Sequence, residues 1–270
     1  MERVFYKKDG RVEYKILPTR NWQAQNPPRS TKTSTILFST TPIRLVTRPE
    51  RIKRLIMGKL NAVIYDCEII NAIPPSKQAE RLPNINYCEG WKDFKNMGIS
   101  VIGMYDYLDD RYRIFCQDNF QAFAERLDSA RIVVDFNGYN FDKPLMEASG
   151  IPSLLLEGLD ELEFPYHYDI LREIWKADGN DPDIFDKNTH SGYGLDACAK
   201  ANFDIKKTGH GAQAPIDWQE GRIGNVIDYC LNDVIITKRL FDRILKDGFI
   251  VNPKDPARII KMPYFTKIYN

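Results

Sequence analysis

"YDCEII", residues 65–70, places two carboxylates inside a run that is otherwise typical of a buried β-strand. Successive side chains of a strand point to opposite faces, so Asp66 and Glu68 share one face and stand side by side. Like charges that are neighbours on one face of a strand are unfavourable unless an opposite charge compensates them. Bound cations supply such a charge, so this strand is predicted to carry a functional site.

The rest of the chain alternates strand and helix patterns around this first strand, which we expect over residues 61–70. A polar, proline-containing insertion follows it and extends to about residue 96. Further strands are predicted at 99–107, 111–116, 131–137 and 166–171. Helices are predicted at 119–130, with Asn119 as N-cap, and at 140–150, 192–203 and 222–246. This order predicts an α/β fold over residues 61–250, a mixed central β-sheet flanked by helices.

Residues 1–60 differ from the rest of the chain in charge and pattern. They contain 14 Lys and Arg against 4 Asp and Glu, whereas the remainder contains 24 against 33. We expect a basic, β-prone and partly flexible N-terminal extension, which either meets a polyanion or forms a solvated surface. Residues 251–270 are expected to form a C-terminal tail.

Composition excludes several classes of protein. No apolar run approaches the roughly 20 residues that cross a bilayer, and the N-terminus lacks the apolar segment of a secretory signal. The five cysteines are well separated and include no C-x-x-C pair, which argues against a disulfide framework and a zinc site. These features favour a cytoplasmic protein in a reducing compartment, without membrane contact.

Two further aspartates stand at positions that matter chemically. Asp142 follows the strand at 131–137, and Asp233 lies among apolar residues of the last helix, where an isolated charge is costly. Each has an ordinary explanation, as a capping residue or a helix-surface residue. Together with Asp66 and Glu68, they predict a site for Mg²⁺ or Mn²⁺, which prefer such oxygen ligands. Tyr229 precedes Asp233 by one helical turn and shares its face, either oriented toward a water molecule or packed in the core.

Three segments in order, YDCEI, NGYNFDKP and YCLND, resemble the motifs of DEDDy-type 3′–5′ exonucleases. This DnaQ-like family has the ribonuclease H-like fold and includes the proofreading domains of family B DNA polymerases. The resemblance spans residues 60–247, and residues 207–241 also resemble stand-alone bacterial and phage relatives. It implies that Asp66, Glu68, Asp142 and Asp233 bind two Mg²⁺ (or Mn²⁺) ions and that Tyr229 positions the attacking water. The histidine subtype would need His at position 228, which is Asp here.

Four other residues are weaker candidates for substrate binding. By the same resemblance, Asn137 contacts nucleic acid and Phe141 packs near the terminal bases. The alternatives are a turn asparagine and a core phenylalanine. Lys207 and His210 lie in a glycine-containing loop, which either contacts a phosphate or base or is simply solvated.

The resemblance implies hydrolysis of terminal phosphodiester bonds at the 3′ ends of single-stranded DNA or RNA, with DNA favoured, to nucleoside 5′-monophosphates. Expected partners are these nucleic-acid ends and a separate replication or repair protein. The alternative is a non-catalytic ribonuclease H-like module that binds nucleic acid and recruits a partner. An endonuclease or resolvase on the same fold would give Tyr229 no obvious purpose.

Overall fold

The computed structural model describes residues 2–8, 11–17, 60–75, 80–151, 166–205 and 211–262, and for residues 2–17 the backbone alone. Most of the basic extension lies outside these ranges, as do Lys207, His210 and the last eight residues. The expectations for those segments therefore stay predictions.

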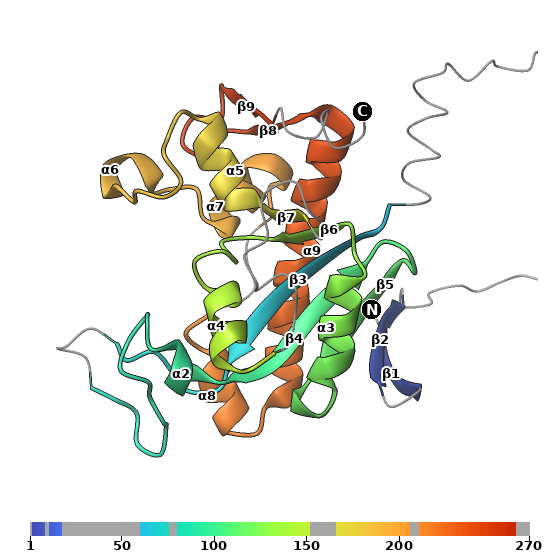
Figure 1. Cartoon of the computed structure of the whole chain (residues 1–270). Helices are drawn as coiled ribbons and strands as arrows, with labels where there is room; N and C mark the ends of the chain where they lie inside the picture. Colours follow the sequence, from blue (N-terminus) through green and yellow to red (C-terminus); the bar gives the residue numbers. More distant parts are fainter. Residues whose placement is uncertain are drawn as a thin grey trace, which may run out of the picture.

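A seven-stranded sheet with the order β1-β2-β5-β4-β3-β6-β7 runs through the molecule (Figure 1). Neighbours from β1 to β3 are antiparallel, whereas β6 is parallel to β3 and β7 is parallel to β6. The predicted mixed sheet is thus confirmed. Its strands are Glu2–Lys8 (β1), Arg11–Leu17 (β2), Ala62–Ile69 (β3), Ile99–Asp106 (β4), Arg111–Phe115 (β5), Ile132–Asp135 (β6) and Tyr166–Asp169 (β7).

The first two strands belong to the part of the chain predicted as an extension. Their backbones form a hairpin, and β2 pairs with β5 through Val12 opposite Ile114 and Glu13 opposite Arg113. The start of the extension therefore continues the central sheet at the edge next to β5. The division of the chain at residue 60 stays a prediction.

The two faces of β3 are buried against different sets of helices. Ala62 and Ile64 pack into one hydrophobic cluster, and Val63, Tyr65 and Cys67 pack into another. This alternation is the period-two pattern of a strand covered on both sides. Because Asp66 continues the even-numbered series, it is turned toward the face of Ala62 and Ile64.

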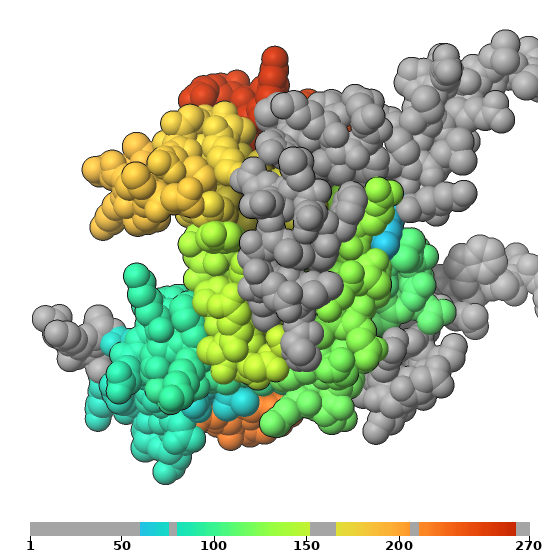
Figure 2. All heavy atoms as spheres, viewed as in Figure 1, coloured from blue at the N-terminus to red at the C-terminus, as the bar shows by residue number. Residues whose placement is uncertain are grey.

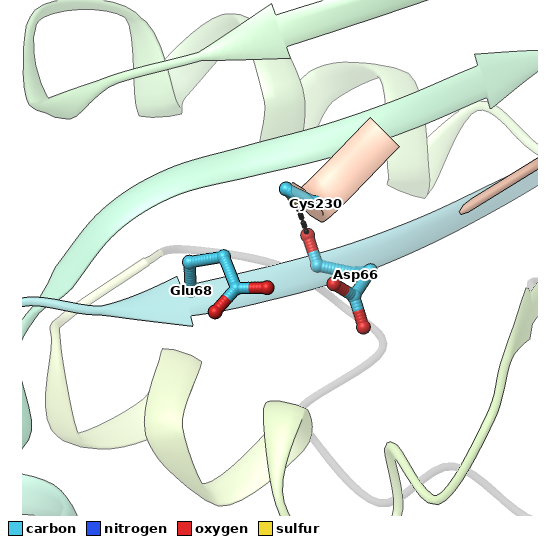
Figure 3. A group of neighbouring side chains, drawn as sticks. All are labelled: Asp66, Glu68 and Cys230. Carbon is cyan, nitrogen blue, oxygen red and sulfur yellow. Dashed lines mark hydrogen bonds between the residues drawn. The ribbon is translucent and has the colours of Figure 1, made fainter. Parts of the chain in front are cut away.

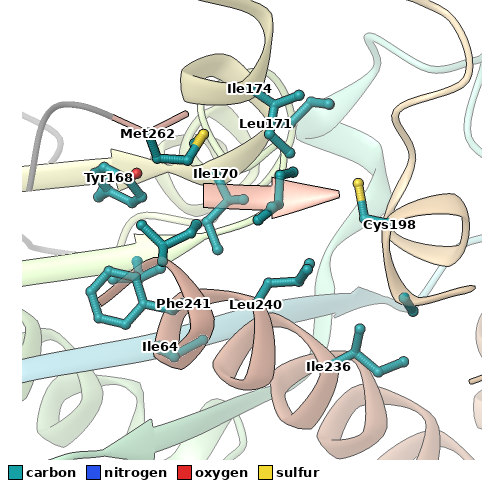
Figure 4. Close-up of a cluster of buried hydrophobic side chains, with 14 of the residues drawn as sticks. Ile64, Tyr168, Ile170, Leu171, Ile174, Cys198, Ile236, Leu240, Phe241 and Met262 are labelled. Atoms are coloured by element: carbon teal, nitrogen blue, oxygen red, sulfur yellow. The ribbon is translucent and has the colours of Figure 1, made fainter. Parts of the chain in front are cut away.

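The helices divide between these two faces (Figures 1 and 4). The Ile64 face is covered by α5 (Ile170–Ala177), α7 (Leu195–Phe203) and α9 (Ile223–Asp247), and the Tyr65 face by α2 (Phe94–Met97), α3 (Phe120–Asp128) and α4 (Asp142–Ala148). Shorter elements are η1 (Gln117–Asn119), α6 (Lys187–His190), α8 (Ala214–Gln219) and a small hairpin of β8 (Phe249–Val251) and β9 (Ile259–Lys261). The core is therefore two apolar layers separated by the sheet.

Helix α9 confirms the predicted last helix to within one residue at each end. It buries Val226, Cys230, Val234 and Phe241 among others, spaced by four or seven residues, so one stripe faces the sheet. The helix ends at Gly248, whose φ of 74° is the left-handed conformation that favours glycine. This stripe is what brings Tyr229 and Asp233 to β3.

The strand predicted at 166–171 is shorter than expected. It ends at Asp169, whose side chain accepts hydrogen bonds from the N–H groups of Leu171 and Arg172 and caps α5. These two donors would otherwise lack partners in the first turn of a helix. The apolar residues Ile170 and Leu171, which resemble a strand in sequence, are therefore the first turn of a helix that the sequence did not predict.

All five cysteines are free, which agrees with the prediction that no disulfide framework exists. None of the described helices is both long enough and apolar enough to cross a membrane.

Truncation of a core aromatic residue should measure how strongly α9 is held on the sheet. Phe241 is fully buried and its ring lies 5.7 Å from that of Tyr168 on β7. We expect Phe241→Ala to lower the free energy of unfolding in urea by about 3–5 kcal/mol, because it removes apolar contacts and leaves a cavity. Ile184→Ala, at a 67% exposed position, should change it by less than about 0.5 kcal/mol. Equal effects of the two substitutions would contradict this packing.

Candidate active site

Asp66 and Glu68 lie side by side on the face of β3 that α9 covers. Glu68 is 6% exposed and Asp66 is half-buried. One oxygen from each carboxylate and Sγ of Cys230 on α9 all lie within 4.8 Å of one another (Figure 3). Two acidic groups this close and this poorly hydrated repel each other unless a cation or a proton intervenes.

Cys230 joins the helix to the sheet. Its thiol donates to the backbone oxygen of Asp66 (3.3 Å), and its sulfur accepts from the N–H of Gly103 on β4 (3.1 Å). A Cβ at Gly103 would lie only 2.8 Å from this sulfur, so the position requires glycine. Burial holds the pKa of Cys230 well above its usual value, so the thiol stays neutral. A neutral, hydrogen-bonded thiol is a poor ligand for a hard cation, which leaves the carboxylates as the ligand candidates.

Tyr229 and Asp233 lie on the same face of α9 and approach the carboxylates of β3. Burial raises the pKa of Tyr229 far above its usual value, and the charges of Asp233, Glu68 and Asp66 act in the same direction. Its hydroxyl also lies beside Gly211, where an added Cβ would come within 3.3 Å of it. Asp233 is 5% exposed. The helix therefore supplies a protonated phenol and a buried carboxylate to the same face as Asp66 and Glu68.

Asp142 reaches the site from a different direction. It is the first residue of α4, is 4% exposed, and its Oδ1 accepts the backbone N–H of Cys67 at 3.0 Å. Cys67 stands between the two carboxylates of β3, so Asp142 is tied to the middle of that motif. Burial, then the charge of Asp135, raises the pKa of Asp142 to about 7, although the bond from Cys67 opposes this.

The structure thus brings the five predicted catalytic residues to one region of β3. Asp66, Glu68, Tyr229 and Asp233 influence one another directly, and Asp142 joins them through the backbone of Cys67. Asp142 and Asp233 are not members of the group within 4.8 Å. Hard oxygen donors, burial and unfavourable like charges all suit divalent cations. Their roles as ligands stay predictions.

Two aspartates that the sequence did not assign to the site fix the loop in front of Asp142. Asp169 accepts the N–H groups of Asn137 (2.9 Å) and Tyr139 (3.1 Å), while Asp135 accepts the N–H of Gly138 (3.2 Å). A Cβ at Gly138 would lie 2.0 Å from Asp135 Oδ2, so this contact also requires glycine. The only sequence signal was that each aspartate ends a predicted strand or lies near its end.

The side chain of His167 lies against the carboxylate of Asp135. The distance from His167 Nε2 to Asp135 Oδ2 is 2.5 Å. Burial lowers the pKa of His167, but the charge and hydrogen bond of Asp135 outweigh it and raise the pKa overall. Asp135 and His167 therefore form a close, largely buried contact beneath the loop that leads to Asp142, and it becomes an ion pair when His167 is protonated.

The structure describes two of the four predicted substrate-binding residues, Asn137 and Phe141. Asn137 has a φ of 68° and accepts a hydrogen bond from Asn140, as a turn asparagine does. Phe141 is half-buried at the start of α4 and packs against the Tyr65 side of the core. Their contacts with nucleic acid stay predictions, as do those of Lys207 and His210.

The comparisons with known proteins concern mainly the fold. A family model described as the RNase_H superfamily matches residues 89–245, more than half of the chain. Asp142, Tyr229 and Asp233 lie inside this range, and Asp66 and Glu68 precede it. The predicted ribonuclease H-like α/β fold is confirmed by this match.

Among solved structures, that of the family B DNA polymerase from the hyperthermophilic archaeon Pyrobaculum calidifontis is similar, with 15% sequence identity and a TM-score of 0.47. The similarity covers 68% of this chain and 24% of the polymerase chain, so this chain spans about a quarter of that protein's length. No curated protein matches the chain.

The raised pKa of Asp142 predicts how metal-free stability depends on pH. Between about pH 4 and 7 the folded chain holds a proton on Asp142 that the unfolded chain releases, so the stability it contributes falls as the pH rises. In chelator, the free energy of unfolding should be greater at pH 5 than at pH 7.5, and Asp142→Asn should reduce this difference by about 1 kcal/mol or more.

A smaller slope should remain in Asp142→Asn, because the pKa of Asp169 is raised to about 6, mainly by burial, and that of His167 is also raised. Asp118→Asn, at an exposed position, serves as the control and should leave the full pH difference in place. An Asp142→Asn protein with the same pH dependence as the wild type would contradict the assignment.

Proposed function

We propose that this chain, which belongs to the RNase_H superfamily, is a metal-dependent 3′–5′ exonuclease of the DEDDy type. The substrate would be single-stranded nucleic acid, DNA in preference to RNA, and the products nucleoside 5′-monophosphates. The observation that carries this proposal is the meeting of Asp66 and Glu68 with Tyr229 and Asp233 on the covered face of β3.

The carboxylates suit a pair of divalent cations. Asp66, Glu68, Asp142 and Asp233 would hold two Mg²⁺ or Mn²⁺ ions, as ligands with hard oxygen atoms and little competing hydration. Bound ions of this kind would supply positive charge at the scissile phosphodiester and favour attack by water. The fixed loop before Asp142 supports this assignment, because its carboxylate is held at the N–H of Cys67 with little freedom to move.

Tyr229 would orient the attacking water by hydrogen bonding. In the metal-free protein, burial raises the pKa of Tyr229 further above its usual value, so the phenol is protonated at neutral pH. A protonated hydroxyl can still donate or accept a hydrogen bond and fix the direction of attack on the terminal phosphate. This role explains a tyrosine beside a buried aspartate better than core packing does.

The decisive experiment is digestion of end-labelled single-stranded DNA and RNA. With Mg²⁺ or Mn²⁺ the wild type should shorten 5′-labelled strands progressively from the 3′ end. Asp66→Ala and Asp233→Asn should lower the rate by roughly 100-fold or more, and Tyr229→Phe should lower kcat with little change in KM.

Tyr107→Phe is a matched control for Tyr229→Phe. The hydroxyl of Tyr107 also bonds an aspartate of α9, Asp242, at 2.6 Å, but this aspartate follows Asp233 by nine residues, about two and a half helical turns. It should retain the wild-type rate. The proposal fails if the wild type shows no metal-dependent shortening from the 3′ end, or if the aspartate variants match it. In that case a non-catalytic nucleic-acid-binding module would be the better interpretation.

The basic N-terminal extension would strengthen substrate binding through phosphate contacts. Neutralising three of its arginines, Arg48, Arg51 and Arg54, to Gln should weaken binding of a single strand and reduce the slope of log K against log salt by up to about 2. Fluorescence anisotropy across a salt series measures both quantities.

The same number of exposed lysines from outside residues 1–60 provides the control. These lysines are Lys187, Lys246 and Lys261. We expect their combined change to Gln to leave the slope of log K against log salt within error of the wild type. Equal slopes for the two triple variants and the wild type would rule out an electrostatic role for the extension.

A further inference from the structure

Trp91 is the most exposed large hydrophobic side chain among the described residues, with 70% of its surface accessible. Tryptophan is usually buried over most of its surface, because its large ring gains most from leaving water. The residue lies in the insertion between β3 and β4, just before α2. An indole presented to solvent at this point is a feature that packing alone does not explain.

The Trp91 ring is connected to the candidate active site through two phenylalanines. Its centroid lies 6.2 Å from that of Phe141, which in turn lies 5.9 Å from Phe94, both in tilted, edge-to-face arrangements. Phe141 directly precedes Asp142, and α2 packs on α4. On the face shown in Figure 2, the teal segment that contains α2 lies directly beside the yellow-green α4. Trp91 is thus the outer member of an aromatic cluster whose inner member adjoins a proposed metal ligand.

Two other large aromatic side chains of the described chain are exposed, and both make ring contacts of their own. Tyr139 has the guanidinium of Arg172 over its ring at 4.0 Å and stacks on His167. Phe185 packs against Trp175 and His190, on the opposite side of the sheet. No cation–π contact to Trp91 occurs among the residues that the structure describes. With 70% of its surface exposed, Trp91 is accessible to a ligand.

The charges around Trp91 indicate what such a ligand would be. Glu89 and Asp93 balance Lys92 and Lys95 along the same segment, so the surface does not select a strongly charged group. A nucleobase is neutral, planar and stacks well on indole whatever its identity. Bases in the interior of a duplex have both faces covered by their neighbours, whereas an unpaired base offers a free face.

We propose that Trp91, supported by Phe141 and Phe94, is a stacking platform for an unpaired nucleobase near the 3′ end of the substrate. The inference deepens the proposed exonuclease function and rests on it for the placement of the 3′ end. The platform makes binding independent of sequence and dependent on strand separation, so the chain selects single-stranded or frayed ends.

The test compares base-dependent binding in variants of the full chain. In an Asp66→Ala background, which prevents cleavage, Trp91→Ala should weaken binding of a single-stranded oligonucleotide by about 5- to 100-fold. Trp91→Phe should retain most of the affinity because it keeps an aromatic face. Phe185→Ala, at a 66% exposed position, is the matched control and should bind as the parent does.

Abasic substrates show whether the lost contact is with a base. We expect an abasic nucleotide at one of the last three positions to weaken binding to the parent and to have little further effect on Trp91→Ala. The inference is overturned if Trp91→Ala binds as the parent does, or if its loss is equal on every abasic substrate. A change in oligomeric state without a change in affinity, seen by size-exclusion chromatography, would also overturn it and would identify a self-association surface instead.

These outcomes separate the platform from the proposed activity. If the wild type digests 3′ ends and Trp91→Ala digests them with the same KM, the exonuclease proposal is supported and the stacking platform is ruled out. If the wild type does not digest nucleic acid but the Trp91→Ala variant loses base-dependent binding, the stacking platform is supported and the exonuclease proposal is ruled out.

Discussion

The hydrogen bond from the N–H of Cys67 to Asp142 is the contact on which the arrangement of the site depends. The parallel pairing of β3 with β6 ends at Ile64 and Val134, whereas β3 continues to Ile69. Beyond that point, no strand of the described residues pairs with β3 on the β6 side, and a buried backbone donor without a partner is costly. The carboxylate of Asp142 satisfies Cys67, so the need to pair the backbone also fixes a side chain beside the two acidic residues of β3.

A second constraint holds α9 against the same strand. The sulfur of Cys230 lies between the backbones of β3 and β4 and is close enough that only glycine fits at position 103. Because Cys230 directly follows Tyr229 and is three residues before Asp233, this close approach sets where both functional side chains lie. The apolar stripe of α9 stabilises the packing of the helix on the sheet. The close contact between Cys230 and Gly103 sets the position of the helix along the sheet.

Much of this architecture could be predicted from the sequence, and the failures have physical reasons. Periodicity predicted β3, β4, β5 and α9 well, because these elements are long and buried on a regular face. It missed the change from strand to helix after Asp169, since that change depends on one side-chain cap rather than on the apolar pattern. The acidic motif on β3 and the Tyr229–Asp233 spacing could be recognised because each involves residues close together in the sequence. The roles of Asp135 and His167 were not, because their contact joins β6 to β7 across 32 positions of the chain.

Several acidic residues gather at one edge of the sheet, and their contacts differ. Parallel strands bring their carboxyl ends to one edge of a sheet, so β3, β6 and β7 collect several aspartates there. His167 contacts Asp135, and backbone N–H groups of a loop and a helix hydrogen-bond Asp169, so these two carboxylates make contacts with other parts of the fold. Asp66 and Glu68 lie side by side on β3, and one oxygen of each lies within 4.8 Å of the other and of the sulfur of Cys230. Asp142 and Asp233 belong to the proposed metal site because the fold holds them near this pair, Asp142 through the N–H of Cys67 and Asp233 beside Tyr229.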